Sequence, residues 1–508
     1  MWGKRELELK LELTSEQLQL IAADPVLRRL RVGEPETRAL RSIYFDSPDQ
    51  RPREAGVSLR VRSDGEHWVQ TIKRGTGVTS GVSSPTEVET VVGGPEPDLS
   101  SIEPRKVRRK IAKLLNGAPP QPVFETVVNR SVHRVQNGAA QMDLALDDGV
   151  VRSGTAEEPV CELELELKSG SAADLLKTAV ELFGAVPARL AESNKAARGY
   201  GLVNGGTRPR LKPERAQDVQ LAVDASCAEA LGQFVESASG QIIANRAVVL
   251  ETDDPEGPHQ LRIGLRRLRS AIRLMRSVFD TKATREVDKY ARRLARSVGE
   301  LRDADVLIDD ICAQVDAIED ERGLRHVRKA LDAHRARTRK AARAALESTD
   351  WYALQVYLAL LPRAVEESED LQGPIADFAQ HALDRIWKKV TKRAKRLAKL
   401  DPGQRHKLRK ALKQLRYGSE FLGSLYKKRD VQPFLGHLKK LQDVIGYWND
   451  VEMARQLVTI VEERCATKPA CQRVAGYILG WHRAQAQQCY ASADKGFGDL
   501  EQTAPFWR

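Results

Sequence analysis

The segment Glu6-Leu7-Glu8-Leu9-Lys10-Leu11-Glu12-Leu13 alternates charged residues with leucines, and Cys161-Glu162-Leu163-Glu164-Leu165-Glu166-Leu167-Lys168 repeats this pattern later in the chain. A period of two predicts a β-strand whose charges face one side and whose leucines face the other. Aligned carboxylates repel one another unless a cation lies among them. Two such strands therefore favour a shared space that holds cations, and Mg²⁺ or Mn²⁺ prefer oxygen ligands of this kind. Two amphipathic strands with solvated faces are the alternative.

The composition is that of a globular protein with two or more domains. The chain has 508 residues, 41% of them hydrophobic, and contains no apolar run long enough to span a membrane. Its first residues are charged where a signal peptide needs an apolar region, and its six cysteines lack paired or metal-ligand spacing. We therefore expect a cytoplasmic protein with free thiols and no membrane partner.

The positive charge is concentrated in the second half of the chain. Residues 1–210 contain 30 Lys and Arg against 29 Asp and Glu, which leaves 52 against 41 for the remainder. A polyanion is the natural partner of such a surface. Aromatic residues make up only 5% of the chain, so the stacking platforms of a single-strand nucleic-acid binder are scarce and we expect no specific nucleic acid.

Two hydrophobic periods divide the chain. Residues 1–204 read mainly as short strands, among them 41–45, 56–62, 67–73, 123–136 and 141–146, with helices at 104–115 and 171–183. Residues 205–217 read as a linker rich in glycine and proline. From 218 to 500 the period becomes that of helices, and 501–508 is a short tail.

The helical half contains an internal repeat at an offset of 147 residues. His259, Leu261, Arg262, Leu265 and Leu268 recur as His406, Leu408, Arg409, Leu412 and Leu415, and the same offset relates Gly299 to Gly446 and Asp303 to Asp450. One offset that holds over two separate helices predicts two copies of one helical unit. In each copy the leucines form one stripe and His, Lys and Arg form another, so a ladder of cations faces away from the core.

The residues of the first half carry a resemblance to a known family. Glu6-x-Glu8-x-Lys10, Tyr44-Phe45-Asp46, Leu59-Arg60-Val61-Arg62, Lys73, Glu87-x-Glu89, Asp147, Glu162-x-Glu164-x-Glu166 and Ser193-Asn194-Lys195 occur in an order and spacing that resemble the CYTH domain, the triphosphate tunnel metalloenzyme family. The resemblance implies an α+β domain with a closed eight-stranded antiparallel tunnel that binds a triphosphate and metal. Ser84-Pro85-Thr86 stands where relatives often carry an arginine, so one phosphate contact is in doubt.

The resemblance also implies roles for single residues. It implies catalytic roles for Glu6, Glu8 and Asp147, and metal ligation by Glu6, Glu8, Glu162 and Glu164. It implies that the phosphates are bound by Lys10, Arg60, Arg62, Lys73, Arg130 and Lys195.

The helical half resembles the CHAD domain, which implies two pseudo-symmetric four-helix bundles with a basic groove for inorganic polyphosphate. The residues that this resemblance assigns to polyphosphate are His259, Arg262, Arg266, Arg269, Arg293, His406, Arg409, Lys413, Arg416 and Lys440. A nearby polyanion raises the pKa of a histidine, so His259 and His406 are suited to gain charge on binding.

Together the two resemblances imply a bacterial-type inorganic triphosphatase that uses Mg²⁺ or Mn²⁺ and also binds polyphosphate. Two alternatives remain open at this stage, a class IV adenylate cyclase and a non-catalytic polyphosphate-binding scaffold. The sequence does not give the oligomeric state, the preferred metal or the physiological triphosphate.

Overall fold

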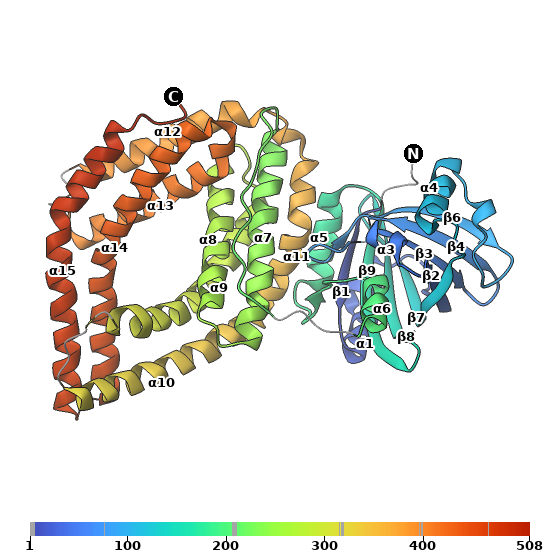
Figure 1. Cartoon of the computed structure of the whole chain (residues 1–508), viewed down its shortest axis with the longest axis horizontal. Coiled ribbons are helices and arrows are strands. Elements are labelled where there is room, and N and C mark those ends of the chain that lie inside the picture. The colour runs from blue at the N-terminus through green and yellow to red at the C-terminus, as the bar shows by residue number, and fades with distance from the viewer. Residues whose placement is uncertain are drawn as a thin grey trace. The chain divides into compact units, whose positions relative to one another are not determined.

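The computed structural model describes residues 6–75, 77–205, 211–313, 315, 320–395, 397, 400–465 and 467–508. It divides the chain into two compact units, residues 1–210 with 352–367 and residues 211–351 with 368–508. The first is built on an antiparallel sheet and the second is helical, which confirms the predicted fold class (Figure 1). No helix in the described part of the chain is long and apolar enough to cross a membrane.

The sheet of the first unit has ten strands rather than the eight expected. They are β1 (Glu8–Glu12), β2 (Glu36–Asp46), β3 (Val57–Ser63), β4 (Trp68–Arg74), β5 (Val82–Ser83), β6 (Thr86–Val92), β7 (Gln121–Asn137), β8 (Ala140–Ser153), β9 (Ala156–Ser169) and β10 (Arg189–Leu190). The two extra strands are β5 and β10, and two residues are too few to show a period. The strand order is β10-β1-β9-β8-β7-β2-β3-β4-β6.

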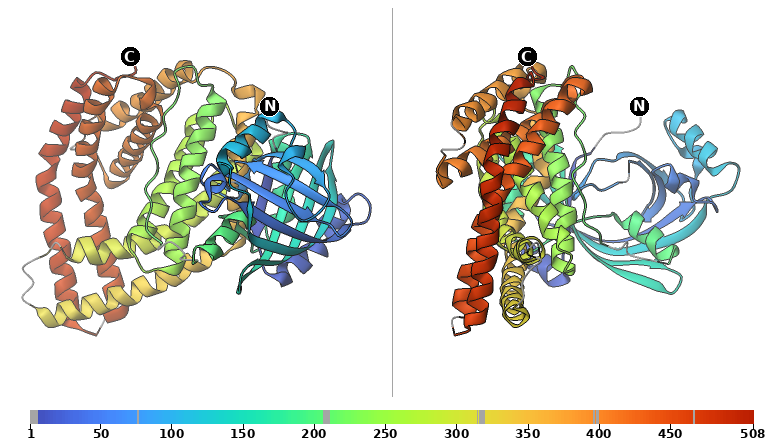
Figure 2. Two further views of the ribbon diagram at one scale, coloured as in Figure 1. Left: turned by 45° about the vertical axis from the view of Figure 1, so that its right-hand side comes forward. Right: turned by 60° about the vertical axis from the view of Figure 1, so that its left-hand side comes forward.

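The sheet curls around its inner face (Figure 2). Its two ends meet at β1, because β5 lies just before β6 in sequence and pairs with β1 through Glu8 and Ser83. The two alternating segments found in the sequence are neighbours in register, with Glu8 opposite Glu166 and Lys10 opposite Glu164. Leu9, Leu11, Leu163 and Leu165 are fully buried, so the leucine face packs into a core and the charged face lines the curl.

Helices pack against this sheet, and the last of them along the chain begins at a cavity on its inner face. They are α1 (Ser15–Ala22), α2 (Pro25–Leu30), α3 (Arg51–Glu54), α4 (Arg105–Leu115), α5 (Ala172–Phe183) and α6 (Lys195–Val203), with a short 3₁₀ turn, η1 (Leu99–Ser101). The apolar side of α4 packs on β3 and β4 in a core with Val57, Val61 and Ile72. The Asn194 side chain accepts a hydrogen bond from Ala197 N and caps the N-terminal end of α6. The helix therefore begins at Lys195, and the position of Lys195 is fixed by the cap.

The helical half has nine α-helices in the described residues. They are α7 (Cys227–Glu251), α8 (Glu256–Met275), α9 (Lys282–Val306), α10 (Glu321–Leu346), α11 (Thr349–Glu366), α12 (Ile375–Ala394), α13 (Pro402–Leu422), α14 (Lys428–Cys465) and α15 (Pro469–Gln502). A π-helical turn, η2 (Leu307–Cys312), follows α9, and two 3₁₀ turns are η3 (Glu369–Leu371) and η5 (Gly423–Leu425).

The predicted repeat is visible in these helix boundaries. Helices α12, α13, α14 and α15 begin 148, 146, 146 and 148 residues after α7, α8, α9 and α10. The two copies are not separate four-helix bundles, however, since α10 of the first copy packs against α14 and α15 of the second. Their shared core includes Val327, Leu331, Leu457 and Ile478. An amphipathic pattern shows which face of a helix is buried but not against which partner.

Helix α11 lies between the two copies in sequence, and residues 352–367 belong to the first unit instead of the helical one. Gln355 donates a hydrogen bond to the carbonyl of Ala188 at 2.8 Å, and Glu367 accepts one from the amide of Ala172 at 2.7 Å. The carboxylate of Glu367 thereby meets the positive N-terminal end of α5. From sequence alone these residues fall within 218–500, because a helix that is apolar on most sides does not reveal its partner.

Candidate active site and basic ladders

A charged cavity of about 400 Å³ opens on the inner face of the curled sheet. Its charged lining residues are the cations Lys10, Arg60, Arg62, Lys73, Arg130, Lys168 and Lys195 and the carboxylates Glu6, Glu8, Glu87, Glu89, Glu164 and Glu166. Nine of the residues that the sequence singled out therefore share one space. Asp147 and Glu162 are not part of the wall and lie buried behind it, at 0% and 1% exposure.

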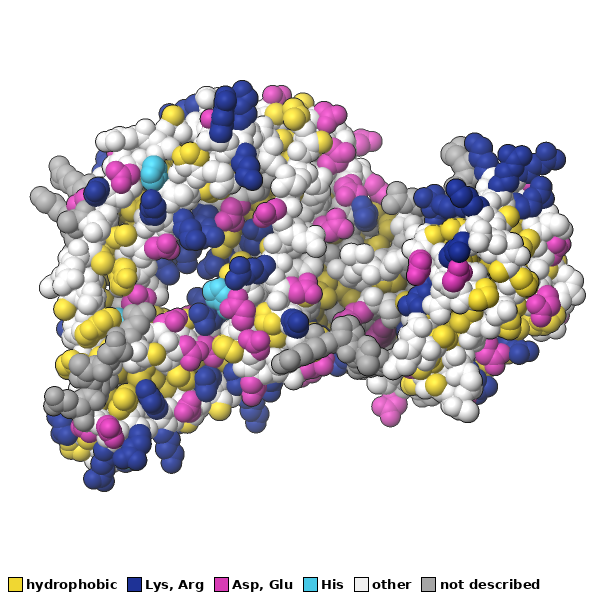
Figure 3. All heavy atoms as spheres, in the orientation of Figure 1, with side chains coloured by type: hydrophobic (Ala, Val, Ile, Leu, Met, Phe, Trp, Pro, Cys, Tyr) yellow, Lys and Arg dark blue, Asp and Glu magenta, His cyan; other side chains and the backbone are white. Residues whose placement is uncertain are grey.

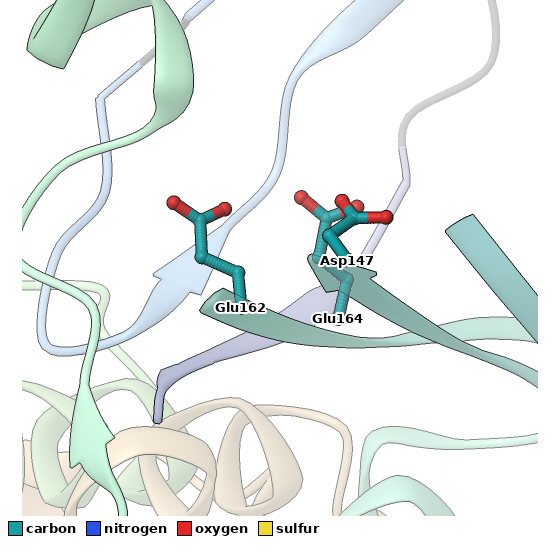
Figure 4. A group of neighbouring side chains, drawn as sticks. All are labelled: Asp147, Glu162 and Glu164. Atoms are coloured by element: carbon teal, nitrogen blue, oxygen red, sulfur yellow. The ribbon is translucent and has the colours of Figure 1, made fainter. Parts of the chain in front are cut away.

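Three carboxylates gather on β8 and β9 at one side of the cavity. Oxygen atoms of Asp147, Glu162 and Glu164 lie within 4.8 Å of one another, and the three side chains rise from the same face of the two strands (Figure 4). The ammonium of Lys195 contacts all three, at 2.8, 2.5 and 3.1 Å. Arg130 adds a two-pronged contact to Asp147, with both distances 2.6 Å, and a third contact to Glu164.

These cations determine the protonation of the carboxylate cluster. Burial alone raises the pKa of Glu164, but Lys10, Lys195 and Arg130 outweigh it and hold that pKa well below its usual range. The pKa of Asp147 is likewise lowered, since Lys195 and Arg130 overcome the effect of burial. Asp147 and Glu164 are therefore ionised, and side-chain cations already neutralise them. Asp147 touches no open part of the cavity, so its contacts suit a residue that positions Arg130 and Lys195.

At the opposite end of the acidic lining, Glu6 forms no ion pair among the described residues, whereas Lys168 pairs with its neighbour Glu166 at 2.7 Å. Burial, together with the nearby carboxylates of Glu87 and Glu166, raises the pKa of Glu6 to about 7. Lys73 contacts Glu87, and Lys10 contacts Glu8 at 3.0 Å. Glutamates from three strands thus meet where side-chain cations are fewer, and an added divalent cation would relieve their repulsion.

Arg60 and Arg62 are the cations of the cavity that lack carboxylate partners. Both come from β3, and neither forms an ion pair with a carboxylate among the described residues. Arg62 donates from Nε to the hydroxyl of Ser42 at 3.1 Å, while Nε of Arg60 is buried without a hydrogen-bond partner. Burial and the neighbouring guanidinium groups of Arg60 and Arg130 lower the pKa of Arg62 to about 9. Buried cations without counter-ions are costly, so this pair is prepared for an anionic ligand.

The structure adds residues that the sequence had not assigned to the site. Glu87, Glu166 and Lys168 line the cavity, and Tyr44 lies against the arginines, which lower its pKa although burial raises it. Arg198 binds Glu162 at 2.9 Å from behind. The alternation of Glu162, Glu164 and Glu166 was the available signal for Glu166, because residues two apart on a strand share a face.

In the helical unit the two predicted ladders lie on α8 and α13, which pack against each other. We call them the basic ladders, and they consist of His259, Arg262, Arg266 and Arg269 on α8 and His406, Arg409, Lys413 and Arg416 on α13. Burial and then Arg266, Arg409 and Arg262 lower the pKa of Lys413 to about 6. Cations of both copies therefore repel one another within one site. Figure 3 shows an opening in the helical unit with Lys and Arg side chains around its rim.

The two ladders differ in how far they are neutralised. In the first, Arg262 pairs with Asp303 at 2.5 Å and Arg269 with Asp288 at 2.9 Å. In the second, Arg416 pairs with Glu420 at 2.7 Å, whereas Arg409 donates to the neutral amide of Asn449 at 2.7 Å and Lys413 forms no ion pair among the described residues. A cavity of about 560 Å³ opens beside it, and its cationic lining residues are Arg405, His406, Arg409, Arg455 and Arg483. The second ladder has the greater need of an anion.

The remaining candidates of the helical half are less closely connected to the ladders. Arg293 pairs with Asp350 at 3.0 Å, and Lys440 is exposed on α14. Burial, with cations nearby, lowers the pKa of both His259 and His406. The histidines are thus neutral near pH 7 in the free protein and can gain a proton only when an anion arrives.

Comparison with known proteins assigns the two halves to families. Residues 4–200 match the CYTH domain and residues 233–459 match the CHAD domain. The inorganic triphosphatase of Haemophilus influenzae is 30% identical over 204 residues, which cover 39% of this chain and 54% of that protein. An uncharacterized protein of Mycobacterium tuberculosis is 26% identical over 506 residues, 93% of this chain and 92% of that one.

Among solved structures, the CHAD domain from the plant Ricinus communis is similar to the helical half. The superposition has a TM-score of 0.51 at 28% identity and covers 57% of this chain and 96% of that chain.

Proposed function

Because the chain is a CYTH domain followed by a CHAD domain, we propose that it hydrolyses inorganic triphosphate to phosphate and diphosphate in the tunnel. We further propose that the basic ladders bind inorganic polyphosphate. The Haemophilus triphosphatase supports the first part through the CYTH region, which spans about half of that protein. The free thiols of all six cysteines support our proposal of a cytoplasmic location.

The observation that carries the proposal is the pair of arginines without counter-ions opposite a row of glutamates. Arg60 and Arg62 offer planar forks that match phosphate oxygens, and Lys73 and Lys10 add point charges beside them. A triphosphate would provide the negative charge that the arginines lack. Lys10 and Lys195 are held by Glu164, and their ammonium groups can exchange that carboxylate for phosphate oxygens when substrate enters.

The carboxylates that line the cavity fit a divalent metal ion. We place it at Glu6 and Glu8, with Glu164 and Glu166 as facing oxygen donors, because these four reach the open space. Glu162, which the family resemblance had included, is held by Lys195 and Arg198 behind the wall. When bound, the metal would neutralise phosphate oxygens and lower the pKa of water.

The residues of the chain would then support hydrolysis in the following way. Arg60, Arg62 and the lysines hold the three phosphates and neutralise the charge that spreads over the terminal oxygens in the transition state. An oxygen of water forms a bond to the terminal phosphorus while the bridging P–O bond breaks and diphosphate leaves. The proton of that water would pass to a carboxylate of the cavity lining.

A phosphate-release assay tests this function. Triphosphate, ATP, thiamine triphosphate and long polyphosphate are compared in Mg²⁺, in Mn²⁺ and in EDTA, and cyclic AMP is measured in parallel. We expect metal-dependent release from triphosphate above all other substrates. Cyclic AMP from ATP would replace the proposal with a cyclase, and the absence of turnover on every substrate would replace it with a binding scaffold.

A further inference from the structure

A strongly basic helix lies on the outer surface of the first unit, away from the tunnel cavity. Helix α4 carries six cations in eleven residues, Arg105, Lys106, Arg108, Arg109, Lys110 and Lys113, and no acidic residue. Figure 3 shows Lys and Arg side chains gathered over this helix. None of these residues lines the cavity, and neither the proposed reaction nor the ladders use them.

The helix is held rigidly by its other side. Val107, Ile111 and Leu115 are at most 3% exposed and pack in a core with Leu59, Ile72 and further residues of β3 and β4. Arg105, Lys106, Arg109 and Lys113 are exposed, and none of these four forms an ion pair within the described part of the chain. A fixed scaffold therefore presents unneutralised cations to the outside.

This arrangement is unfavourable for the helix itself. Arg105 and Arg109, and then Arg109 and Lys113, are four residues apart, where like charges repel. The first turn has no acidic residue and Pro104 provides no side-chain cap, so cations stand at the end of the helix where the dipole favours anions. Both features leave positive charge on the helix without a compensating negative charge. This suggests that an external anion compensates it.

The exposed face selects for a linear polyanion without bases or acyl chains. Arg105, Arg109 and Lys113 form a straight stripe of about 12 Å, given a rise of about 1.5 Å per residue. Neither α4 nor η1 beside it carries an aromatic residue on which a base could stack. Val107, Ile111, Leu114 and Leu115 of α4 are buried or packed against its core, and Ala112 is its one exposed apolar residue, so no apolar side of the helix is left to enter a membrane.

We propose that the exposed face of α4 is a second binding surface for inorganic polyphosphate, separate from the basic ladders. The choice of polyphosphate as its occupant rests on the proposed function of the ladders. Two sites on one chain would raise the effective concentration of the polymer for each other, which strengthens binding without any new contact.

The test uses the full-length protein in the background R262A/R409A, which weakens the ladders. To this background we add K106A/R109A/K113A, and in a matched control R28A/K177A/R189A. The control residues are exposed cations of the same unit and form no ion pair among the described residues. Both triple variants lose three charges, so a difference between them reports position and not net charge.

We expect the α4 variant to bind long polyphosphate at least tenfold more weakly than the control, with triphosphate hydrolysis unchanged in both. The salt dependence should also flatten, because fewer counterions are released. Equal affinities would overturn the proposal and identify α4 as a solvated face. A loss confined to single-stranded RNA or to anionic lipid vesicles would overturn it as well. If R262A/R409A alone leaves polyphosphate binding intact, the proposed function of the ladders is wrong. That result is independent of the comparison between the α4 variant and its control.

Discussion

The tunnel cavity and the basic ladders both concentrate cations, but they neutralise them in opposite ways. In the tunnel, Lys195 and Arg130 are held by carboxylates at distances of 2.5 to 3.1 Å, and of the described cations of the cavity only the two arginines of β3 form no ion pair with a carboxylate. Between the ladders, Lys413 faces four arginines, and its pKa falls to about 6. A site that supplies most of its own counter-charge suits a small substrate with metal. A site that leaves part of its charge unpaired suits a polymer that brings many anions at once.

Removing a carboxylate from the tunnel should have the largest effect on this contrast. Glu6→Gln or Glu8→Gln keeps the side-chain size and removes a proposed metal ligand, so hydrolysis of triphosphate should fall about a hundredfold or more. Polyphosphate binding should remain. Glu16, exposed on α1, provides the control Glu16→Gln. Steady-state phosphate release measures the effect, and near-normal rates in both tunnel variants would rule out the metal assignment.

The arginines without counter-ions provide the second prediction. Arg62→Ala should lower kcat/KM for triphosphate about a hundredfold, and Arg62→Lys should recover only part of it, since lysine cannot form the two-pronged contact. Folding should persist, because the substitution removes a buried charge that has no partner. Kinetics of the two variants beside wild type give the comparison. A lysine variant equal to wild type would mean that Arg62 acts only through its field.

The ladders should respond through affinity and not through turnover. R262A/R409A should weaken polyphosphate binding about tenfold or more, whereas K340A/K428A, which removes two exposed lysines, should change it little. Of the single variants, Arg409→Ala should cost more than Arg262→Ala, because Asp303 already neutralises Arg262. Titration calorimetry with polyphosphate of defined length measures all four. Equal losses in the two double variants would make the ladders part of a diffuse positive surface.

A smaller effect should appear as a pH dependence of polyphosphate binding. Lys413 is largely neutral in the free protein above pH 6, and a bound polyanion favours its charged form, so binding takes up a proton. Affinity should therefore strengthen by several fold as the pH falls from 9 to 7, a range in which both histidines are neutral. Lys413→Met should flatten the profile. A wild-type affinity that is constant over this range would contradict the inference.

Much of this architecture could be predicted from the sequence, and the gaps have physical causes. The alternating segments predicted β1 and β9, and the offset of 147 predicted the paired helices, because both patterns depend on local periods. The strands β5 and β10 were not predicted, since two residues have no period. The core shared by α10, α14 and α15, and the place of α11, depend on which buried faces meet, and a single sequence does not contain this information.

The same limit applies to the site. Nine of the predicted site residues line one cavity, as their types and their positions on strands had indicated. The ion pairs of Lys195 with Asp147 and Glu162 could not be predicted in this way, because they form only when α6 packs against β8 and β9. Those contacts separate Glu162, which is held by Lys195 and Arg198 behind the wall, from Glu6, which forms no ion pair among the described residues. The sequence spacing identified the strands that carry the candidate metal ligands. The ion pairs of the structure show which carboxylates on those strands are already held by cations.

The central claim, that the tunnel cavity hydrolyses triphosphate and the basic ladders bind long polyphosphate, is tested most directly by a double dissociation. Triphosphate hydrolysis with Mg²⁺ and polyphosphate binding in EDTA are measured on full-length wild type, Arg62→Ala and R262A/R409A. We predict that Arg62→Ala loses hydrolysis and keeps binding, and that R262A/R409A binds polyphosphate about tenfold or more weakly and keeps hydrolysis. If either variant loses both activities, or if EDTA abolishes polyphosphate binding, the division of function is contradicted.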